Sequence, residues 1–146
     1  AMVNSGALRQ DIEAGLVTKG DLISAFPFPN TVVITKLKGS QVKKIFDHAA
    51  GMTNGILQVS ENVRYSFSPG NTAQKIVING ELLNDNQEYW VAAPNFVTQG
   101  GDGYLEFNNS LEYIDSGVLV VDATEFFLKS IETYQPKYDG RIEVLD

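Results

Sequence analysis

The chain has 146 residues, of which 43% are hydrophobic and 20% are charged, and its formal net charge is -7. This length is typical of one domain, and the acidic balance argues against binding to a nucleic-acid polymer, because contacts to a phosphate backbone need clustered Lys and Arg. A single nucleotide is not excluded. The absence of cysteine rules out disulfides and thiolate chemistry.

No apolar run approaches the ~20 residues that span a membrane, so we expect no transmembrane segment in this sequence. The first residues, Ala1-Met2-Val3, do not form a basic segment followed by an apolar run. We therefore expect no signal peptide here. The Ala-Met start is typical of a cloning remnant, and it predicts that the chain is an excised domain of a longer protein.

Two helices and a strand are predicted in the first third of the chain. Thr18 precedes Asp21 by three residues, a spacing typical of a capping box, and it predicts a short helix that ends at Pro27. The β-branched run 31–37 predicts a strand, and Ser40 is expected to cap a helix that ends near residue 50. The apolar face of this second helix consists of Val42, Ile45, Phe46 and Ala49.

The middle of the chain is predicted to form hairpin-connected strands. A glycine-containing connection over 51–56 leads to strand character at 57–59 and to alternating apolar residues over 63–67. Asn79-Gly80 predicts a type I′ turn between a strand at 75–78 and a short return. The next strand is expected at 88–93.

The last third is expected to be less regular until a final helix and strand. Turn-forming residues interrupt 108–117, and Asp122 is expected to cap a helix that ends near Thr133. Its buried side is predicted to consist of Phe126, Phe127, Ser130 and Ile131. The run 141–145 predicts a last strand. Hairpin-connected strands mixed with helices favour a single α+β domain over 1–146, with a mixed or antiparallel sheet.

One segment, 94–104, is unusually rich in glycine. Gly100, Gly101 and Gly103 surround Asp102, with Phe96 before them and a tyrosine after them. Glycine permits positive φ and a close approach of the backbone to a ligand. The segment therefore fits either a binding loop for a flat, hydroxylated ligand or a tight turn capped by Asp102.

Side chains on three predicted loops could form one binding site. Phe28, held between two prolines, and Phe96 could stack on a planar base, whereas Phe28 could instead fill the core. Asp102 can accept hydrogen bonds from a cis-diol, and Arg9 can donate to phosphate or ribose oxygens unless it is simply solvated. Asn4 has both a donor and an acceptor for a base edge.

The sequence contains few residues and motifs of the kinds that act in catalysis. His48 is the only histidine, and with no cysteine the chain cannot build a transition-metal centre of the usual His-rich kind. We expect His48 to be structural, on a helix that faces the core. The sequence contains no Gly-x-Ser-x-Gly motif and no Walker loop. This chain alone is therefore not expected to be a complete enzyme.

Five segments, taken in order, resemble motifs of the C-terminal, substrate-binding domain of the 5′-nucleotidase family, which includes UDP-sugar hydrolases. Residues 4–9 (NSGALR) resemble Asn-Gly-Gly-Gly-Ile-Arg, and 15–28 resemble the family's stretch ending in Pro-Phe. Residues 37–48 match its Leu-Lys-Gly…Phe-Glu-His helix, 95–104 match Asn-Phe-Leu…Gly-Gly-Asp-Gly-Phe, and 140–142 match Gly-Arg-Ile.

The resemblance implies a nucleoside- or nucleotide-binding domain. By motif position, Phe28 and Phe96 would stack on the base, Asn4 would contact its edge, Asp102 the ribose hydroxyls, and Arg9 the ribose or phosphate. Replacement of two motif glycines and an isoleucine by Ser, Ala and Leu within 4–9 preserves both functional ends but leaves base preference open.

The resemblance also implies chemistry outside this chain. No cofactor is expected here, whereas the family's N-terminal metallophosphoesterase domain would hold two divalent metal ions. Export to the periplasm, the cell surface or the medium is implied as well. The alternatives are a non-catalytic nucleotide-binding module, a cyclic-nucleotide phosphodiesterase and a relative that hydrolyses sulfur esters.

Overall fold

The computed structural model describes residues 1–52 and 56–146. Within these residues the strands form three sheets, with the orders β1-β3, β7-β2-β8 and β6-β5-β4-β9. The strands are β1 (Met2–Asn4), β2 (Thr31–Lys38), β3 (Leu57–Val59), β4 (Val63–Phe67), β5 (Ala73–Ile78), β6 (Glu81–Leu82), β7 (Glu88–Pro94), β8 (Glu112–Leu119) and β9 (Ile142–Val144). Every pairing is antiparallel except that of β4 with β9. The predicted α+β class with a mixed sheet is confirmed.

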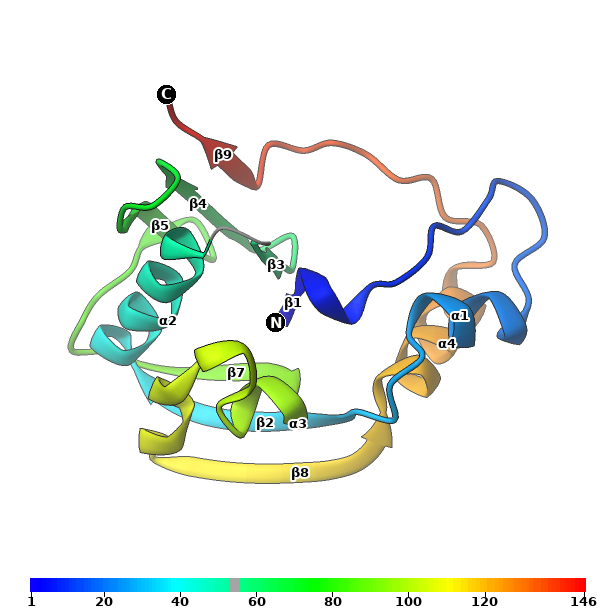
Figure 1. Cartoon of the computed structure of the whole chain (residues 1–146), viewed down its shortest axis with the longest axis horizontal. Helices are drawn as coiled ribbons and strands as arrows, with labels where there is room; N and C mark the ends of the chain where they lie inside the picture. The colour runs from blue at the N-terminus through cyan, green and yellow to red at the C-terminus, as the bar shows by residue number, and fades with distance from the viewer. Residues whose placement is uncertain (53–55) are drawn as a thin grey trace.

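Four α-helices are described, of which α1 and α4 lie side by side at one end of the molecule and α2 lies at the other (Figure 1). They are α1 (Lys19–Ala25), α2 (Gly39–Gly51), α3 (Asn95–Thr98) and α4 (Val120–Ile131). Three 3₁₀ segments accompany them: η1 (Ser5–Ala7), η2 (Gly101–Gly103) and η3 (Leu105–Asn109). Helix α2 packs against β5, β2, β7 and η3, whereas α4 contacts α1, β8 and β2. The main core lies around α2 and the sheets, and it contains Phe46, Tyr65, Phe107 and Tyr104.

Several local predictions are confirmed. Thr18 and Asp21 form the capping box at the start of α1, where the Asp21 amide donates to Thr18 Oγ1 at 3.3 Å and the Thr18 amide donates to Asp21 Oδ2 at 2.7 Å. Asn79 and Gly80 have φ values of 54° and 84°, as a type I′ turn requires. The predicted connection 51–56 lies partly outside the described residues.

The expected start of α2 at Ser40 is wrong. The helix begins at Gly39 with Lys38 as its N-cap residue. The amides of Gly39 and Ser40 donate to the carbonyls of Gln87 and Asp85, and the Lys38 amide donates to Gln41 Oε1 at 2.7 Å. Backbone carbonyls from a distant turn therefore satisfy the helix end, and the Ser40 side chain is not needed as a cap.

The irregular stretch predicted after residue 108 is also wrong in part. Residues 112–119 form β8, which pairs with β2 along an eight-residue strand. The register shifts between Thr31 and Val33, opposite the Asp115-Ser116-Gly117 segment, and Gly117 has a φ of 69°. The turn-forming residues therefore mark an irregularity in a strand pair, a place where glycine is common.

The last helix differs from its prediction in both position and burial. It starts at Val120 with Leu119 as the N-cap residue, so Asp122 lies in the first turn and does not cap the helix. Phe126, Phe127 and Ile131, predicted to be buried, are 78%, 52% and 37% exposed. The helical spacing identified an apolar face, but the described residues do not cover it.

Candidate functional site

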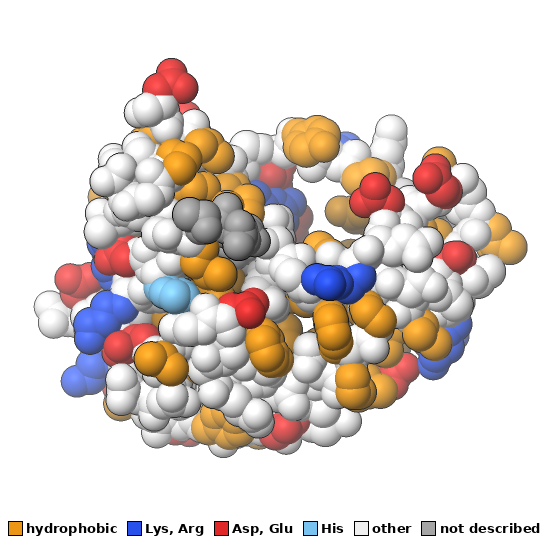
Figure 2. Space-filling model, viewed as in Figure 1, with side chains coloured by type: hydrophobic (Ala, Val, Ile, Leu, Met, Phe, Trp, Pro, Cys, Tyr) orange, Lys and Arg blue, Asp and Glu red, His pale blue; other side chains and the backbone are white. Residues whose placement is uncertain are grey.

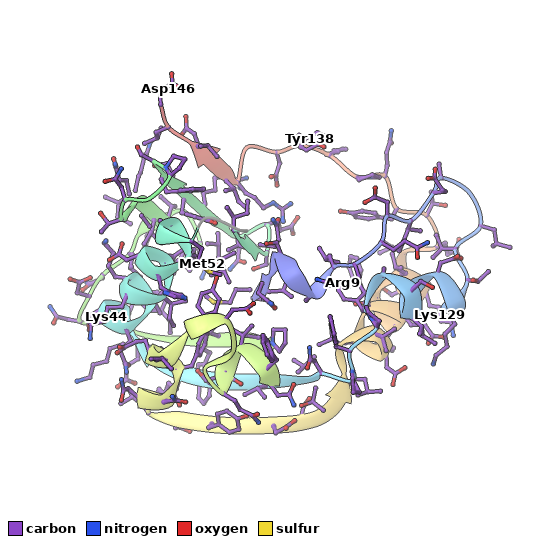
Figure 3. All side chains as sticks on the ribbon, in the orientation of Figure 1. Arg9, Lys44, Met52, Lys129, Tyr138 and Asp146 are labelled. Carbon is purple, nitrogen blue, oxygen red and sulfur yellow. The ribbon has the colours of Figure 1, made fainter. Side chains whose placement is uncertain are left out.

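The five side chains singled out from the sequence line one cleft. Asn4 and Arg9 flank η1, Phe28 follows α1, and Phe96 and Asp102 lie in the segment after β7. The cleft has a volume of about 230 Å³, and its lining consists of Asn4, Gly6, Ala7, Arg9, Phe28, Asn30, Phe96 and Asp102. Figure 3 labels Arg9 beside the η1 segment, and Figure 2 shows this face in the same orientation, with a basic side chain next to hydrophobic ones.

Two phenylalanines form the aromatic part of the cleft. Phe28 and Phe96 are 44% and 43% exposed, so neither fills the core. This outcome removes the alternative in which Phe28 is a core residue. The Arg9 guanidinium lies 5.8 Å from the centroid of the Phe28 ring, a cation–π contact that keeps the cation at the edge of the cleft.

Asp102 is held by Asn4, which lies 98 positions earlier in the chain. Asn4 Nδ2 donates a hydrogen bond of 2.7 Å to Asp102 Oδ2, and the asparagine is only 6% exposed. Among the described residues, Asn4 Oδ1 has no hydrogen-bond partner although it is buried. A buried acceptor without a partner costs free energy, and this one belongs to a side chain that lines the cleft.

The glycines of the loop have the backbone roles that the sequence predicted for them. Gly100 and Gly103 have φ values of 90° and 83°, and Asp102 itself has a φ of 53°. A Cβ on Gly101 would lie 2.6 Å from the Phe96 ring and 2.5 Å from the Phe96 carbonyl oxygen. Any larger residue at this position would therefore displace the aromatic ring from its place in the cleft.

His48 reaches the same loop from helix α2. Its Nε2 lies 2.8 Å from the carbonyl oxygen of Asp102, and its ring meets Tyr104 edge-on with centroids 4.7 Å apart. Tyr104 is buried at 2% exposure, and burial, together with the nearby Asp102 carboxylate, raises the pKa of its phenol to about 12. The sequence predicted a structural residue in His48 but could not identify its partner.

Three lining residues were not among the sequence candidates. Gly6 and Ala7 lie between Asn4 and Arg9 in η1, and Asn30 follows Phe28 by two residues. A Cβ on Gly6 would lie 3.5 Å from Asn4 Nδ2, so this glycine lies against the Asn4–Asp102 pair. The signal for Asn30 was present, because it belongs to the proline-stiffened corner that carries Phe28.

Metal ligands are not grouped in the part of the chain that the structure describes. Over 1–52 and 56–146, no three His, Cys, Asp or Glu side chains lie close enough together to hold a metal ion. The family resemblance places the two-metal centre in an N-terminal domain, so the described residues of this chain are not expected to supply its ligands. Likewise, no helix in the described ranges is long and apolar enough to cross a membrane.

The fold and the cleft together define an α+β domain whose open site combines aromatic, acidic and basic side chains. Residues 1–109 match the family model described as "5'-nucleotidase, C-terminal domain", and the chain belongs to this family. The trifunctional nucleotide phosphoesterase protein YfkN of Bacillus subtilis is 31% identical over 158 aligned positions, which cover 98% of this chain and 11% of that protein. Human 5'-nucleotidase is 30% identical, with coverage of 97% and 28%.

A solved structure shows the same fold. The 5'-nucleotidase precursor from Thermus thermophilus superposes with a TM-score of 0.90 at 24% identity, over 99% of this chain and 31% of that one. This chain thus spans less than a third of the length of each of these relatives. It corresponds to the C-terminal domain of an enzyme family, and the relatives extend well beyond it.

Proposed function

We propose that this chain, over residues 1–146, is the nucleoside-binding domain of a 5′-nucleotidase that hydrolyses nucleoside 5′-monophosphates, with nucleotide sugars as a second substrate class. The observation that carries the proposal is the convergence of the five motif residues on one cleft. Those residues come from three separate segments, and family membership supports a shared role for them.

The cleft offers complementary groups for each part of a nucleoside. Phe28 and Phe96 stack on the base, a contact that contributes about 1–3 kcal/mol per base. Asp102, fixed by Asn4, accepts hydrogen bonds from the ribose diol. Asn4, which lines the cleft, contacts the base edge, and Arg9 donates to ribose or phosphate oxygens.

The hydrolytic step is assigned to a part of the parent protein outside this chain. We infer an N-terminal metallophosphoesterase domain with two divalent metal ions, which would activate water and polarise the phosphoryl oxygens. This chain would position the substrate against that centre, a contribution that can be worth several kcal/mol of barrier. Location in the periplasm, on the cell surface or in the medium is part of the same proposal.

The binding role is tested by calorimetric titration of the chain with adenosine and AMP. We expect weak, saturable binding by the wild type and a loss of at least about fivefold in affinity for Phe96→Ala, because one stacking face is removed. Phe126→Ala is the matched control, since this phenylalanine is exposed on α4 and does not line the cleft. Equal affinities of the two variants would contradict the proposal that Phe96 stacks on the base.

A substrate panel on the full-length parent tests the enzymatic role. Nucleoside monophosphates, a nucleotide sugar, a cyclic nucleotide and a thiosulfate ester are supplied with divalent metal. Preferential release of phosphate from the monophosphates supports the proposal. Turnover of the cyclic nucleotide or sulfur ester alone reassigns the reaction. Binding without turnover, in a parent that lacks Asp-x-His and Asn-His-Glu metal motifs upstream, identifies a non-catalytic module.

A further inference from the structure

His48 contacts the binding loop but is absent from the cleft lining. It comes from α2, 54 positions before Asp102, and its Nε2 lies 2.8 Å from the Asp102 carbonyl oxygen. A backbone carbonyl can only accept a hydrogen bond, so Nε2 must carry the hydrogen. The imidazole therefore donates to the loop, and the edge-on contact with Tyr104 orients its ring for this bond.

The bond acts on a residue with an unusual backbone conformation. Asp102 has a φ of 53°, a left-handed conformation that few residues other than glycine adopt without cost. His48 holds its carbonyl, and Asn4 holds its carboxylate at 2.7 Å. Asp102 is thus fixed at its main chain and at its side chain by two separate elements.

The imidazole also lies close to Gly103, the next residue of the loop. A Cβ on Gly103 would lie 2.9 Å from His48 Cε1, and a Cβ on Gly101 would lie 2.6 Å from the Phe96 ring. Movement of the glycine backbone would therefore disturb the aromatic wall as well as the carboxylate. The hydrogen bond from α2 therefore holds a loop segment that carries Asp102 and packs against Phe96.

We propose that His48 is a positioning residue: its Nε2–H bond to the Asp102 carbonyl preorganises the Asp102 carboxylate and the Phe96 ring for ligand binding, without touching the ligand. This inference rests on the proposed nucleoside-binding function. Preorganisation raises affinity because the free protein has already met the cost of ordering the loop.

Two variants separate the hydrogen bond from the ring. His48→Phe keeps an aromatic ring against Tyr104 but cannot donate, whereas His48→Gln carries an amide Nε2 that can donate to the same carbonyl. We expect about a tenfold loss of adenosine affinity in His48→Phe and recovery to within about threefold of wild type in His48→Gln. Equal losses in the two variants, or none in His48→Phe, would overturn the proposal.

A second measurement needs no ligand. In the free protein the amides of Gly103 and Tyr104 donate to the carbonyls of Gly100 and Gly101 at 3.1 and 3.2 Å. Their hydrogen exchange should be faster in His48→Phe and close to wild type in His48→Gln. Unchanged exchange in His48→Phe contradicts the positioning role even if adenosine fails to bind the wild type, which would be a separate failure of the proposed function.

The wild type itself provides a third test, which stands if His48→Phe does not fold. Nitrogen-15 spectra of the neutral imidazole should show hydrogen on Nε2, as donation to the carbonyl requires. Hydrogen on Nδ1 with a bare Nε2 would exclude the bond and overturn the proposal.

Discussion

Helices α2 and α4 each have an apolar face, but only the face of α2 is buried. Phe46 and Ile45 on α2 are each 1% exposed, whereas Phe126 and Phe127 on α4 are 78% and 52% exposed. Helix α2 is surrounded by strands of two sheets and by η3. Helix α4 lies beside α1 at the other end of the molecule (Figure 1). The comparison teaches that apolar residues at helical spacing identify an apolar face but do not show whether other elements cover it.

The glycine-rich loop 94–104 of the site belongs to the well-packed side of the molecule, with α2. It is held by His48 from α2 and by Asn4 from β1, and Tyr104 anchors it in the core at 2% exposure. The α1–α4 pair, in contrast, is joined at its surface by ion pairs of Lys19 with Asp122 and Glu125. Exposed ion pairs stabilise little, so the two halves should respond differently to substitution.

The largest effect is expected for Phe46→Ala on α2. The ring is 1% exposed, and its centroid lies 4.8 Å from that of Tyr65. Its removal leaves a cavity in a packed core, so the free energy of unfolding should fall by about 3–5 kcal/mol. Urea denaturation followed by circular dichroism measures this change. A decrease in the free energy of unfolding of less than about 1 kcal/mol would mean that α2 is no better packed than α4.

Alkaline pH should weaken the same half through Tyr104. Burial raises the pKa of this phenol from 10.0 to about 12, so its stabilising contribution is complete below pH 10 and is lost as the pH rises towards 12. The loss is on the order of 2 kcal/mol. Urea denaturation at a series of pH values should show a smaller alkaline decline in Tyr104→Phe. Tyr138→Phe, a change at a fully exposed residue, should leave the decline as in wild type.

In the other half, the capping box of α1 should have a moderate effect. Thr18→Ala removes the hydroxyl that accepts from the Asp21 amide, which should lower the free energy of unfolding by about 1 kcal/mol. The midpoint of urea denaturation reports the change. Thr133→Ala, which lies beyond α4 and caps no helix, is the matched control. Identical midpoints for the two variants would show that the capping box is dispensable.

The smallest effect is expected for Phe126→Ala on α4. Its ring is 78% exposed, so the free energy of unfolding should change by less than about 0.5 kcal/mol. The same denaturation assay compares it directly with Phe46→Ala. A loss comparable to that of the core variant would mean that the α4 face is covered in solution, and it would reverse the comparison.

Local sequence signals were sufficient where neighbouring residues decide the structure. The Thr18–Asp21 capping box and the Asn79-Gly80 turn both formed as expected. Asp115-Ser116-Gly117 has equally strong turn chemistry, yet it lies within β8, because pairing with β2 absorbs the irregularity. At both turn-forming segments local chemistry predicted an irregular backbone, and tertiary pairing decided whether the strand continued through it.

The site shows the same division. The ordered motifs indicated Asn4, Arg9, Phe28, Phe96 and Asp102, and the glycines around Asp102 already required an unusual backbone. That these five side chains share one cleft depends on three segments that meet only in the folded chain. The His48 bond to Asp102, the Asn4 bond to the same residue and the exposure of α4 were likewise decided by tertiary structure. The reason is physical: each of these features is set by contacts between residues far apart in sequence, and local spacing carries no information about such contacts.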